Sequence, residues 1–265
     1  MISPLAHISK GATIGNNVRI DPFVMIHEDV HIGDGTHIMS NAVIMPGTTI
    51  GKNCLIFPGA VIGAVPQDLK FVGEKTTVEI GDNTTIRECV TINRGTKDRW
   101  KTAIGSDCLL MAYSHVAHDC LLGNHVILAN AVQLAGHVEV GDYAILGGLS
   151  AAPQFARIGQ HTYIGGGTKI TKDVPPFIKA GREPLSFVGV NSVGLKRRGF
   201  TNDSINQILD IYRTLYNKNL NTSQALLTIE EEMPAVPERH IITSFIREST
   251  RGIVKSHGDE TESEF

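Results

Sequence analysis

The feature that most constrains this chain is a run of aliphatic residues at every sixth position. Steps of six from Ile2 to Ile170 give 29 positions, and 25 of them are Ile, Leu or Val. An amphipathic helix spaces its apolar residues three and four apart, and a half-buried strand alternates every second residue, so neither produces this pattern. A short strand that turns a corner every six residues does, with its aliphatic side chain pointing inward. Three such strands make one turn of eighteen residues, which predicts a three-sided parallel β-helix.

The residues around these aliphatics fit the same fold. Glycine often follows the aliphatic directly, as at Gly33 and Gly51, where it relieves a tight turn. Four positions break the aliphatic pattern, namely Asp68, Glu74, Asp98 and Ala152. The three acidic exceptions fall in two polar stretches, 66–77 and 97–103, which we expect to leave the coil as loops without disturbing its phase. Long loops on a rigid scaffold commonly carry function.

The hexapeptide repeat ends after Ile170, so we divide the chain into a β-helix domain over 1–190 and a C-terminal helical domain over 191–265. In the second domain, apolar residues recur with helical spacing after Thr201 or Asn202, either of which suits a helix N-cap. Further helices are expected over 223–232 and from Pro237 to about Arg251. The polar, acidic stretch 256–265 is expected to fray.

Charge and composition exclude several classes of protein. The formal net charge of −3 and the pI near 6.4 argue against a nucleic-acid binder. The sequence has neither a secretory signal nor an apolar run long enough to span a membrane, so we expect a cytoplasmic protein. No two of the four cysteines have the spacing of a metal or disulfide pair, which favours buried thiols in a reducing compartment; these are Cys54, Cys89, Cys108 and Cys120.

A polar patch interrupts the repeat in its second half. Residues eighteen apart stack at about the ~4.8 Å spacing of neighbouring strands, so His118, Gly136 and Gln154 share one column, and Asp119 and His137 share the next. His115 is expected at the preceding corner. An imidazole here suits a general base, Asp119 could hold a ring, and the Gly136 N–H could stabilise an oxyanion. The alternative is a set of solvated outward-facing groups, as expected for His7, His27, His31, His37 and His161.

Four segments carry a resemblance to a known family. Residues 67–70 (QDLK), 115–120 (HVAHDC), 134–137 (LAGH) and 194–200 (GLKRRGF) resemble, in this order, the UDP-N-acetylglucosamine O-acyltransferases of lipid A biosynthesis. The resemblance covers nearly the whole chain. That family belongs to the left-handed hexapeptide-repeat acyltransferases. The left hand is implied by this resemblance alone, because parallel crossovers in general are right-handed.

The resemblance implies transfer of a 3-hydroxyacyl group from the phosphopantetheine of acyl carrier protein to the 3-hydroxyl of UDP-N-acetylglucosamine. This is the first step of lipid A biosynthesis, and it needs no metal or further cofactor. By motif, His118 resembles the general base and the Gly136 N–H the oxyanion donor. Asp68 and Lys70 resemble sugar and phosphate contacts made across the interfaces of a homotrimer whose active sites lie between subunits.

The resemblance also assigns residues to the substrate. His115 and His137 match substrate-positioning groups, Gln154 matches a glucosamine contact, and Asn191 and Arg197 match nucleotide contacts. The family's measuring position for the acyl chain corresponds to Tyr163 and Gly166. Basic side chains could attract the acidic carrier protein, and these are Lys169, Lys172, Lys179 and Arg182. Pro153 and Val193 depart from the family, which often has histidine and an acidic residue there.

Three other functions compete with this one. A zinc enzyme resembling the carbonic anhydrases of this fold would use three histidines, but His115 and His118 lack the spacing of that family. A non-catalytic scaffold would use the repeat only to space its partners. An acyltransferase could also take a 3-amino variant of the sugar nucleotide as its acceptor.

Overall fold

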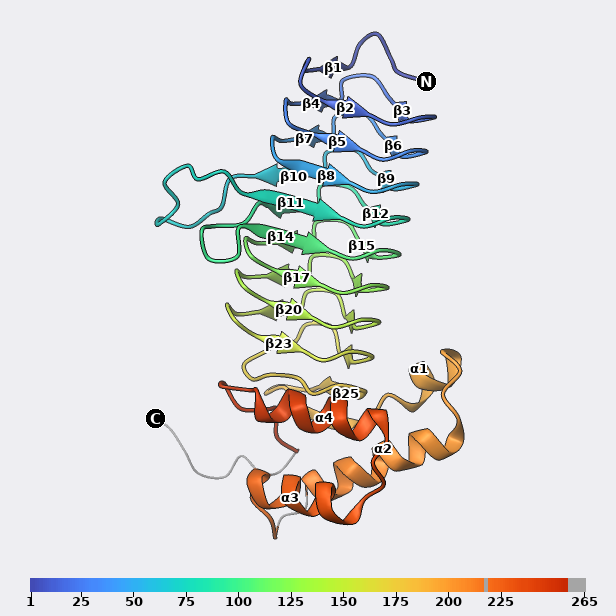
Figure 1. Ribbon diagram of the computed structural model, residues 1–265, viewed down its shortest axis with the longest axis vertical. Coiled ribbons are helices and arrows are strands. Elements are labelled where there is room, and N and C mark those ends of the chain that lie inside the picture. Colours follow the sequence, from blue (N-terminus) through green and yellow to red (C-terminus); the bar gives the residue numbers. More distant parts are fainter. Residues whose placement is uncertain (217–218, 257–265) are drawn as a thin grey trace.

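The structure of the chain, a computed structural model, describes residues 1–216 and 219–256. A tall three-sided coil stands on a small cap of helices, with the N-terminus at the far end from the cap (Figure 1). Most strands are two residues long. The first residue faces outward and the second is buried, as in β4 (Met25–Ile26), where Met25 is exposed and Ile26 fully buried. The inward aliphatics of all three faces make one continuous core along the coil.

Each face of the coil is one sheet. The first face is an eight-stranded parallel sheet. Its strands, in order, are β1 (His7–Ile8), β4 (Met25–Ile26), β7 (Val43–Ile44), β10 (Val61–Ala64), β13 (Thr91–Asn93), β16 (His115–Val116), β19 (Gln133–Leu134) and β22 (Ala151–Ala152). The second face is also eight-stranded and parallel. Its strands are β2 (Thr13–Ile14), β5 (His31–Ile32), β8 (Thr48–Ile50), β11 (Thr77–Ile80), β14 (Lys101–Ile104), β17 (Leu121–Leu122), β20 (Glu139–Val140) and β23 (Arg157–Ile158).

The third face has ten strands, and its last strand runs antiparallel to its neighbour. The strands are β3 (Arg19–Ile20), β6 (His37–Ile38), β9 (Leu55–Ile56), β12 (Thr85–Ile86), β15 (Leu109–Leu110), β18 (Ile127–Leu128), β21 (Ile145–Leu146), β24 (Tyr163–Ile164), β25 (Ile178–Gly181) and β26 (Ser186–Val190). The β25–β26 pair ends the coil and leads into the helices.

The register of the strands explains why the aliphatic phase survives the two loops. Regular neighbours pair eighteen residues apart, as Ile8 does with Ile26. Val61 pairs with Thr91, thirty residues on, and Thr91 pairs with His115, twenty-four residues on. The two insertions therefore add twelve and six residues, which are whole hexapeptides.

Both loops leave the same side of the coil (Figure 1). The first joins β10 to β11 and the second joins β13 to β14. The structure differs from the sequence prediction at the loop ends, because Thr77 begins β11 and 101–103 lie in β14 rather than outside the coil. These two strands pair over four residues, from Thr77 with Lys101 to Ile80 with Ile104, and the longer ladder draws the loop ends into the sheet.

Four helices close the C-terminal end of the coil. The sequence pattern did not predict α1 (Ser192–Arg197). α2 (Asn202–Leu215) begins after Thr201, whose hydroxyl accepts a hydrogen bond from the Ser204 N–H, as an N-cap does. α3 (Thr222–Glu232) carries a capping box, and α4 (Pro237–Arg247) ends before the expected Arg251. Within the described residues, no helix is long and apolar enough to cross a membrane. Ser256 bridges to Phe187; the rest of the predicted acidic tail lies outside the described residues.

Most corners of the coil are made by non-glycine residues with left-handed backbone. Examples are Asn53 (φ 53°), Asp119 (φ 60°) and His137 (φ 64°), each three residues after a buried aliphatic. Along one corner, rings at these positions stack into a column, with His161 between Tyr143 and Phe177. His161 was expected to be solvated, but it is only 8% exposed because the rings above and below it and the chain after the coil cover it.

Candidate active site

His118 lies flat against the backbone of Gly136, one turn of the coil away. A Cβ built on Gly136 would lie 2.4 Å from His118 Cε1 and 2.7 Å from Nε2, so any other residue here would have to displace this ring. Both residues are buried, with His118 4% exposed. They occupy one column of the corner between the first and second faces, as the eighteen-residue spacing predicts.

The buried carboxylate of Asp119 holds the other side of the imidazole. Its Oδ2 accepts from His118 Nδ1 at 2.8 Å and from the Thr96 hydroxyl at 2.7 Å. Its Oδ1 accepts from the backbone N–H groups of Thr96 at 2.9 Å and Arg99 at 3.2 Å. Burial raises the pKa of Asp119, but the hydrogen bonds from Thr96 and His118 outweigh it and hold the pKa below its usual value. Asp119 is therefore ionised at neutral pH and fixes the proton of His118 on Nδ1.

His137 completes a compact cluster with His118 and Asp119. Its ring meets that of His118 edge to face, with centroids 5.1 Å apart, and its Nε2 lies 3.8 Å from Asp119 Oδ2. It stacks on Phe155, and its Nδ1 lies 3.2 Å from Asp98 Oδ2 without the alignment of a hydrogen bond. Burial, partly offset by Asp119, lowers the pKa of His137, so this ring is neutral at neutral pH.

The backbone N–H of Gly136 is available to a ligand. At the corresponding position on the next corner, the N–H groups of Asn16, Lys52 and Asn124 each donate to an aspartate oxygen of the following coil at 2.7 Å. Among the described residues, none accepts a hydrogen bond from the Gly136 N–H. This position of the repeat therefore directs an N–H toward a side-chain oxygen of the following coil, and at Gly136 the N–H beside His118 is left for a ligand.

Two predicted residues lie near this cluster without joining it. His115 lies on β16, on the first face and not at the corner where it was expected, and its Nδ1 is 2.7 Å from the Thr91 hydroxyl. Burial lowers the pKa of His115, and the nearby His118 lowers it further. Gln154 is exposed one turn below Gly136, and its backbone oxygen accepts from Arg251.

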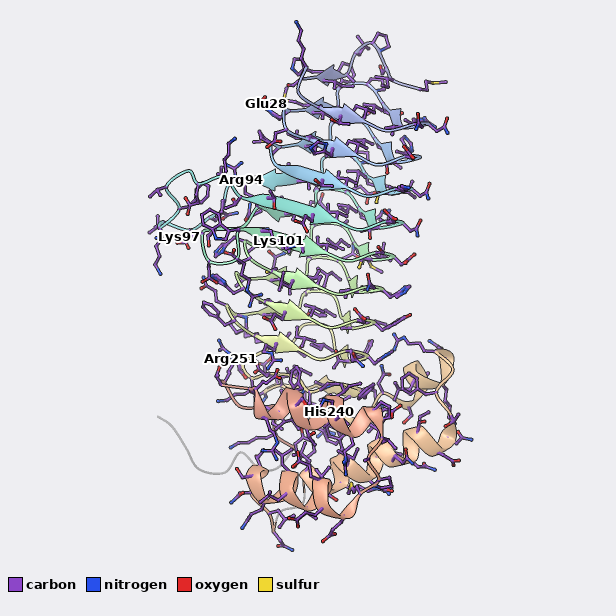
Figure 2. The ribbon with its side chains drawn as sticks, in the orientation of Figure 1. Glu28, Arg94, Lys97, Lys101, His240 and Arg251 are labelled. Carbon is purple, nitrogen blue, oxygen red and sulfur yellow. The ribbon has the colours of Figure 1, made fainter. Side chains whose placement is uncertain are left out.

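A cavity of about 440 Å³ opens over the His137 end of the cluster. Asp68, Lys70 and Glu74 of the first loop line it, together with residues of the second loop, of which Lys97 lies out in the loop away from the coil (Figure 2). The first loop thus reaches His137 within one chain. The contribution across subunits that the resemblance implies for Asp68 and Lys70 stays a prediction.

A second cavity, of about 460 Å³, gathers three further predicted residues on the third face. Tyr163, Asn191 and Arg197 line it, and Lys179 and Arg198 add two further cations. Asn191 is buried because it caps α1, accepting from the Gly194 N–H, and donates to the His161 carbonyl at 2.9 Å. Gly166 is exposed at the corner after β24, outside both of these cavities, where a Cβ would lie 3.0 Å from the Gly148 oxygen.

The two cavities lie on opposite sides of one chain. His118 and His137 occupy the corner between the first and second faces, and in a three-sided coil this corner is opposite the third face. No ligand can bridge both cavities of a single chain through the packed core between them.

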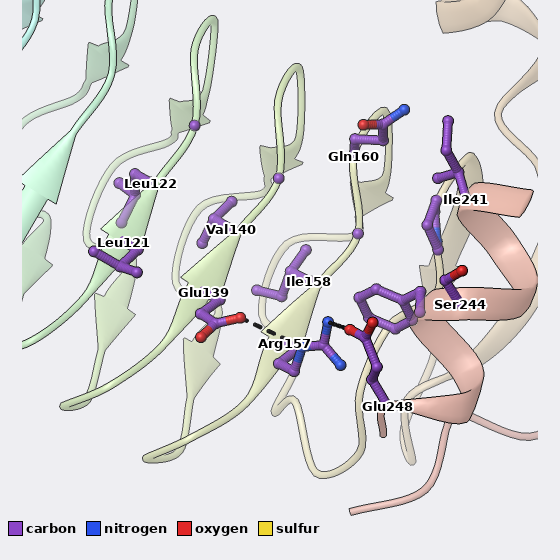
Figure 3. A pocket seen from close by; sticks show the side chains of 15 residues that line it. Leu121, Leu122, Glu139, Val140, Arg157, Ile158, Gln160, Ile241, Ser244 and Glu248 are labelled. Atoms are coloured by element: carbon purple, nitrogen blue, oxygen red, sulfur yellow. Dashed lines mark hydrogen bonds and ion pairs between the residues drawn. The ribbon is translucent and has the colours of Figure 1, made fainter. Parts of the chain in front are cut away.

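A third cavity, of about 540 Å³, lies between the second face and α4 and contains none of the predicted site residues. Arg157 lies at its edge, 3.4 Å from Glu139 and 2.9 Å from Glu248, which follows α4 (Figure 3). Glu139 also pairs with Arg99 at 2.5 Å. A row of ion pairs therefore connects the second loop to the helical cap.

Among the described residues, the one group whose ligand atoms are close enough for a metal ion is His118, Asp119 and His137, within 4.8 Å of one another. Asp119 already accepts four hydrogen bonds, one of them from His118 Nδ1. Because the Asp119 oxygens already accept these hydrogen bonds and orient the His118 ring, the three side chains fit a metal ion poorly.

Comparison with known proteins identifies the chain. The family described as UDP N-acetylglucosamine O-acyltransferase, domain 2, matches residues 173–254, and bacterial transferase hexapeptide repeats match 11–38 and 29–64. LpxA, a UDP-N-acetylglucosamine acyltransferase from Bacteroides fragilis, is 52% identical, with a TM-score of 0.95 over 96% of this chain and 100% of its own. LpxA from Acinetobacter baumannii is 41% identical, with a TM-score of 0.93 over 96% and 99%.

The chain belongs to the UDP-N-acetylglucosamine O-acyltransferase family. The Arabidopsis UDP-N-acetylglucosamine acyltransferase, at 33% identity and a TM-score of 0.86 over 96% and 100% of the two chains, extends the likeness beyond bacteria. The coil is accordingly the left-handed parallel β-helix of this family, as the resemblance predicted.

Sequence reasoning missed the residues that support the site from the loops. Thr96 and Arg99 hold Asp119, Asp98 lies beside His137, and Phe155 stacks beneath that ring. The eighteen-residue spacing that stacks residues on successive turns would have identified Phe155, because it lies eighteen residues after His137. The loop contacts follow no period, so no spacing rule finds them.

Proposed function

We propose that this protein transfers a 3-hydroxyacyl group from acyl carrier protein to the 3-hydroxyl of UDP-N-acetylglucosamine, the first step of lipid A biosynthesis. The observation that carries this proposal is the His118–Asp119 pair, buried over Gly136, in a chain of this acyltransferase family. A base that faces a free backbone N–H is the arrangement that acyl transfer needs.

The residues support the following order of events. His118 carries a proton on Nδ1, given to Asp119, so its Nε2 can accept the proton of the sugar hydroxyl. The hydroxyl oxygen attacks the thioester carbonyl, and the Gly136 N–H stabilises the resulting oxyanion. When the intermediate collapses, the carbon–sulfur bond breaks, and the imidazolium returns its proton to the departing phosphopantetheine thiolate.

The first cavity is suited to the sugar and the second to the nucleotide. Lys70 and Lys97 give the first cavity two cations for phosphate oxygens, and Asp68 gives it a carboxylate for sugar hydroxyls. In the second cavity, Arg197 and Arg198 offer guanidinium groups to a pyrophosphate. Val193 lines this cavity where the family often has an acidic residue, so one acceptor for the nucleotide is replaced by an apolar side chain.

We further propose a homotrimer with active sites between subunits. The opposite positions of the two cavities support it, because one substrate can contact both only if they come from neighbouring chains. Gly166 and Tyr163 then belong to the chain that supplies Arg197, and exposed Lys169 and Arg182 lie on the same chain, available to an acidic carrier protein. A cytoplasmic location is supported by the thiols of Cys54, Cys108 and Cys120, which donate to backbone carbonyls at 3.1–3.2 Å.

The test is an acyl-transfer assay with UDP-N-acetylglucosamine and 3-hydroxyacyl carrier proteins of graded chain length. We expect product with the wild type and a rate lower by about 10²–10⁴ for His118→Ala, the usual contribution of a general base. The 3-amino sugar nucleotide is assayed beside it as an acceptor. No transfer with any donor would overturn the function, and a fully active His118→Ala would overturn the mechanism alone.

A further inference from the structure

Thr96 is the residue that fixes the catalytic carboxylate in place. It is 7% exposed and lies at the start of the second loop, twenty-three residues before Asp119 in sequence. Its backbone N–H and its hydroxyl donate to different oxygens of that carboxylate, at 2.9 and 2.7 Å. One residue therefore binds both oxygens and prevents the carboxylate from rotating.

The hydroxyl has one hydrogen, and its surroundings decide where that hydrogen goes. The Asp98 N–H donates to Thr96 Oγ1 at 3.3 Å, so this oxygen acts as an acceptor toward Asp98. Its own hydrogen is then directed to Asp119 Oδ2. The same Oδ2 accepts from His118 Nδ1, so the threonine hydroxyl and the imidazole are bound to one oxygen.

The second loop is built to hold Thr96 firmly. The Trp100 N–H donates to the Thr96 carbonyl at 2.8 Å, which closes a turn. Gly95 lets the two ends of the loop meet, because a Cβ there would lie 2.4 Å from the Lys101 nitrogen. Arg99 then binds the Asp119 carbonyl at 3.3 Å and Glu139 on the second face.

We propose that Thr96 is a positioning residue for acyl transfer, acting through Asp119 on the orientation of His118. This inference rests on the proposed role of His118 as the general base. It assigns a function to the second loop in the chemical step, beyond lining the cavity. Loss of the hydroxyl should slow catalysis and leave sugar-nucleotide binding intact, because Thr96 lines the first cavity but its hydroxyl hydrogen is given to Asp119 and its hydroxyl oxygen accepts from Asp98.

The test compares Thr96→Val with Thr96→Ser in the full-length protein. Valine keeps the shape and the backbone N–H but removes the hydroxyl, whereas serine keeps it. We expect kcat of Thr96→Val to fall about 10- to 100-fold, the worth of one hydrogen bond to a charged group, with KM for UDP-N-acetylglucosamine unchanged within about twofold. Thr96→Ser should recover most of kcat.

Thr84→Val is the matched control. Thr84 is fully buried in the coil, and its hydroxyl bonds Gly105 and Cys108 far from the site, so this variant loses comparable buried hydrogen bonds without touching Asp119. It should be less stable to heat yet keep wild-type kcat. If Thr96→Val also keeps wild-type kcat while His118→Ala is inactive, the positioning role is overturned alone. A fully active His118→Ala overturns the base and this role with it.

Discussion

At the scale of single residues, the site depends on how closely a ring can approach the backbone. Gly136 has no left-handed φ, so the conformational freedom of glycine is not the reason for its presence. The reason is contact, because the His118 ring occupies the space of a Cβ. In the proposed mechanism, this contact keeps the base and the N–H that receives the oxyanion in fixed relation.

Gly136→Ala tests this contact directly. The added methyl group must push the imidazole away, so we expect kcat to fall about 10²-fold or more, the cost of a displacement of about 1 Å in a catalytic group. The fold should survive, since alanine tolerates this backbone. Steady-state kinetics and circular dichroism check both points. Wild-type kcat in Gly136→Ala would contradict the close packing of ring on backbone.

At the scale of elements, the corner columns carry interactions that the strands do not. The column of His125, Tyr143, His161 and Phe177 stacks four rings along one edge of the coil. Burial, with a smaller effect of the nearby Arg198 and an opposing one of Asp142, lowers the pKa of His161 to about 4. A neutral imidazole is therefore part of the folded state at this corner.

This column predicts how stability depends on pH. The pKa of His161 is lower in the folded chain (about 4) than in the unfolded chain (near 6.5), so its contribution is complete above pH 6.5 and is lost as the pH falls toward 4. The wild type should lose about 3 kcal/mol of unfolding free energy over this range relative to His161→Phe. Denaturant unfolding at several pH values measures it. If the unfolding free energies of the wild type and His161→Phe change in parallel with pH, the lowered pKa of His161 is refuted.

The periodic elements could be predicted from the sequence, and the aperiodic contacts could not. A six-residue period gives the coil, and the eighteen-residue turn that follows from it is enough to place His118 over Gly136 and Asp119 beside His137. The Thr96 contact comes from a loop that returns to the coil by its own path, so sequence spacing carries no information about it. α1 was missed because it spans six residues and depends on a cap at Asn191.

At the scale of the whole molecule, the predicted site is divided. The base and the first loop lie at one corner, and the guanidinium-lined cavity lies on the face opposite. A side-by-side trimer would bring one chain's corner against the next chain's third face, so that two chains would contribute residues to every site.

Subunit complementation tests this arrangement. His118→Ala and Arg197→Ala should each be weakly active alone. Mixed trimers that contain both chains should recover about a third of wild-type activity, because one of their three interfaces then receives an intact half from each side. Co-expression with two different affinity tags isolates the mixed species. Mixed trimers no more active than the parents would show that each chain holds its own complete site.

The left-handed corners have a consequence for how such a protein acquires chemistry. Residues branched at Cβ are absent from the described non-glycine corner positions of this kind, whereas Asn, Asp, His and the aromatics recur there. The backbone thus selects, for steric reasons alone, many of the side chains that can ligate, titrate and stack. Asp119 and His137 are two such residues, and they are neighbours on successive turns of the coil. A coil of this type therefore carries many polar and aromatic side chains along its corners, and a new site can arise where neighbouring turns place two side chains that act together.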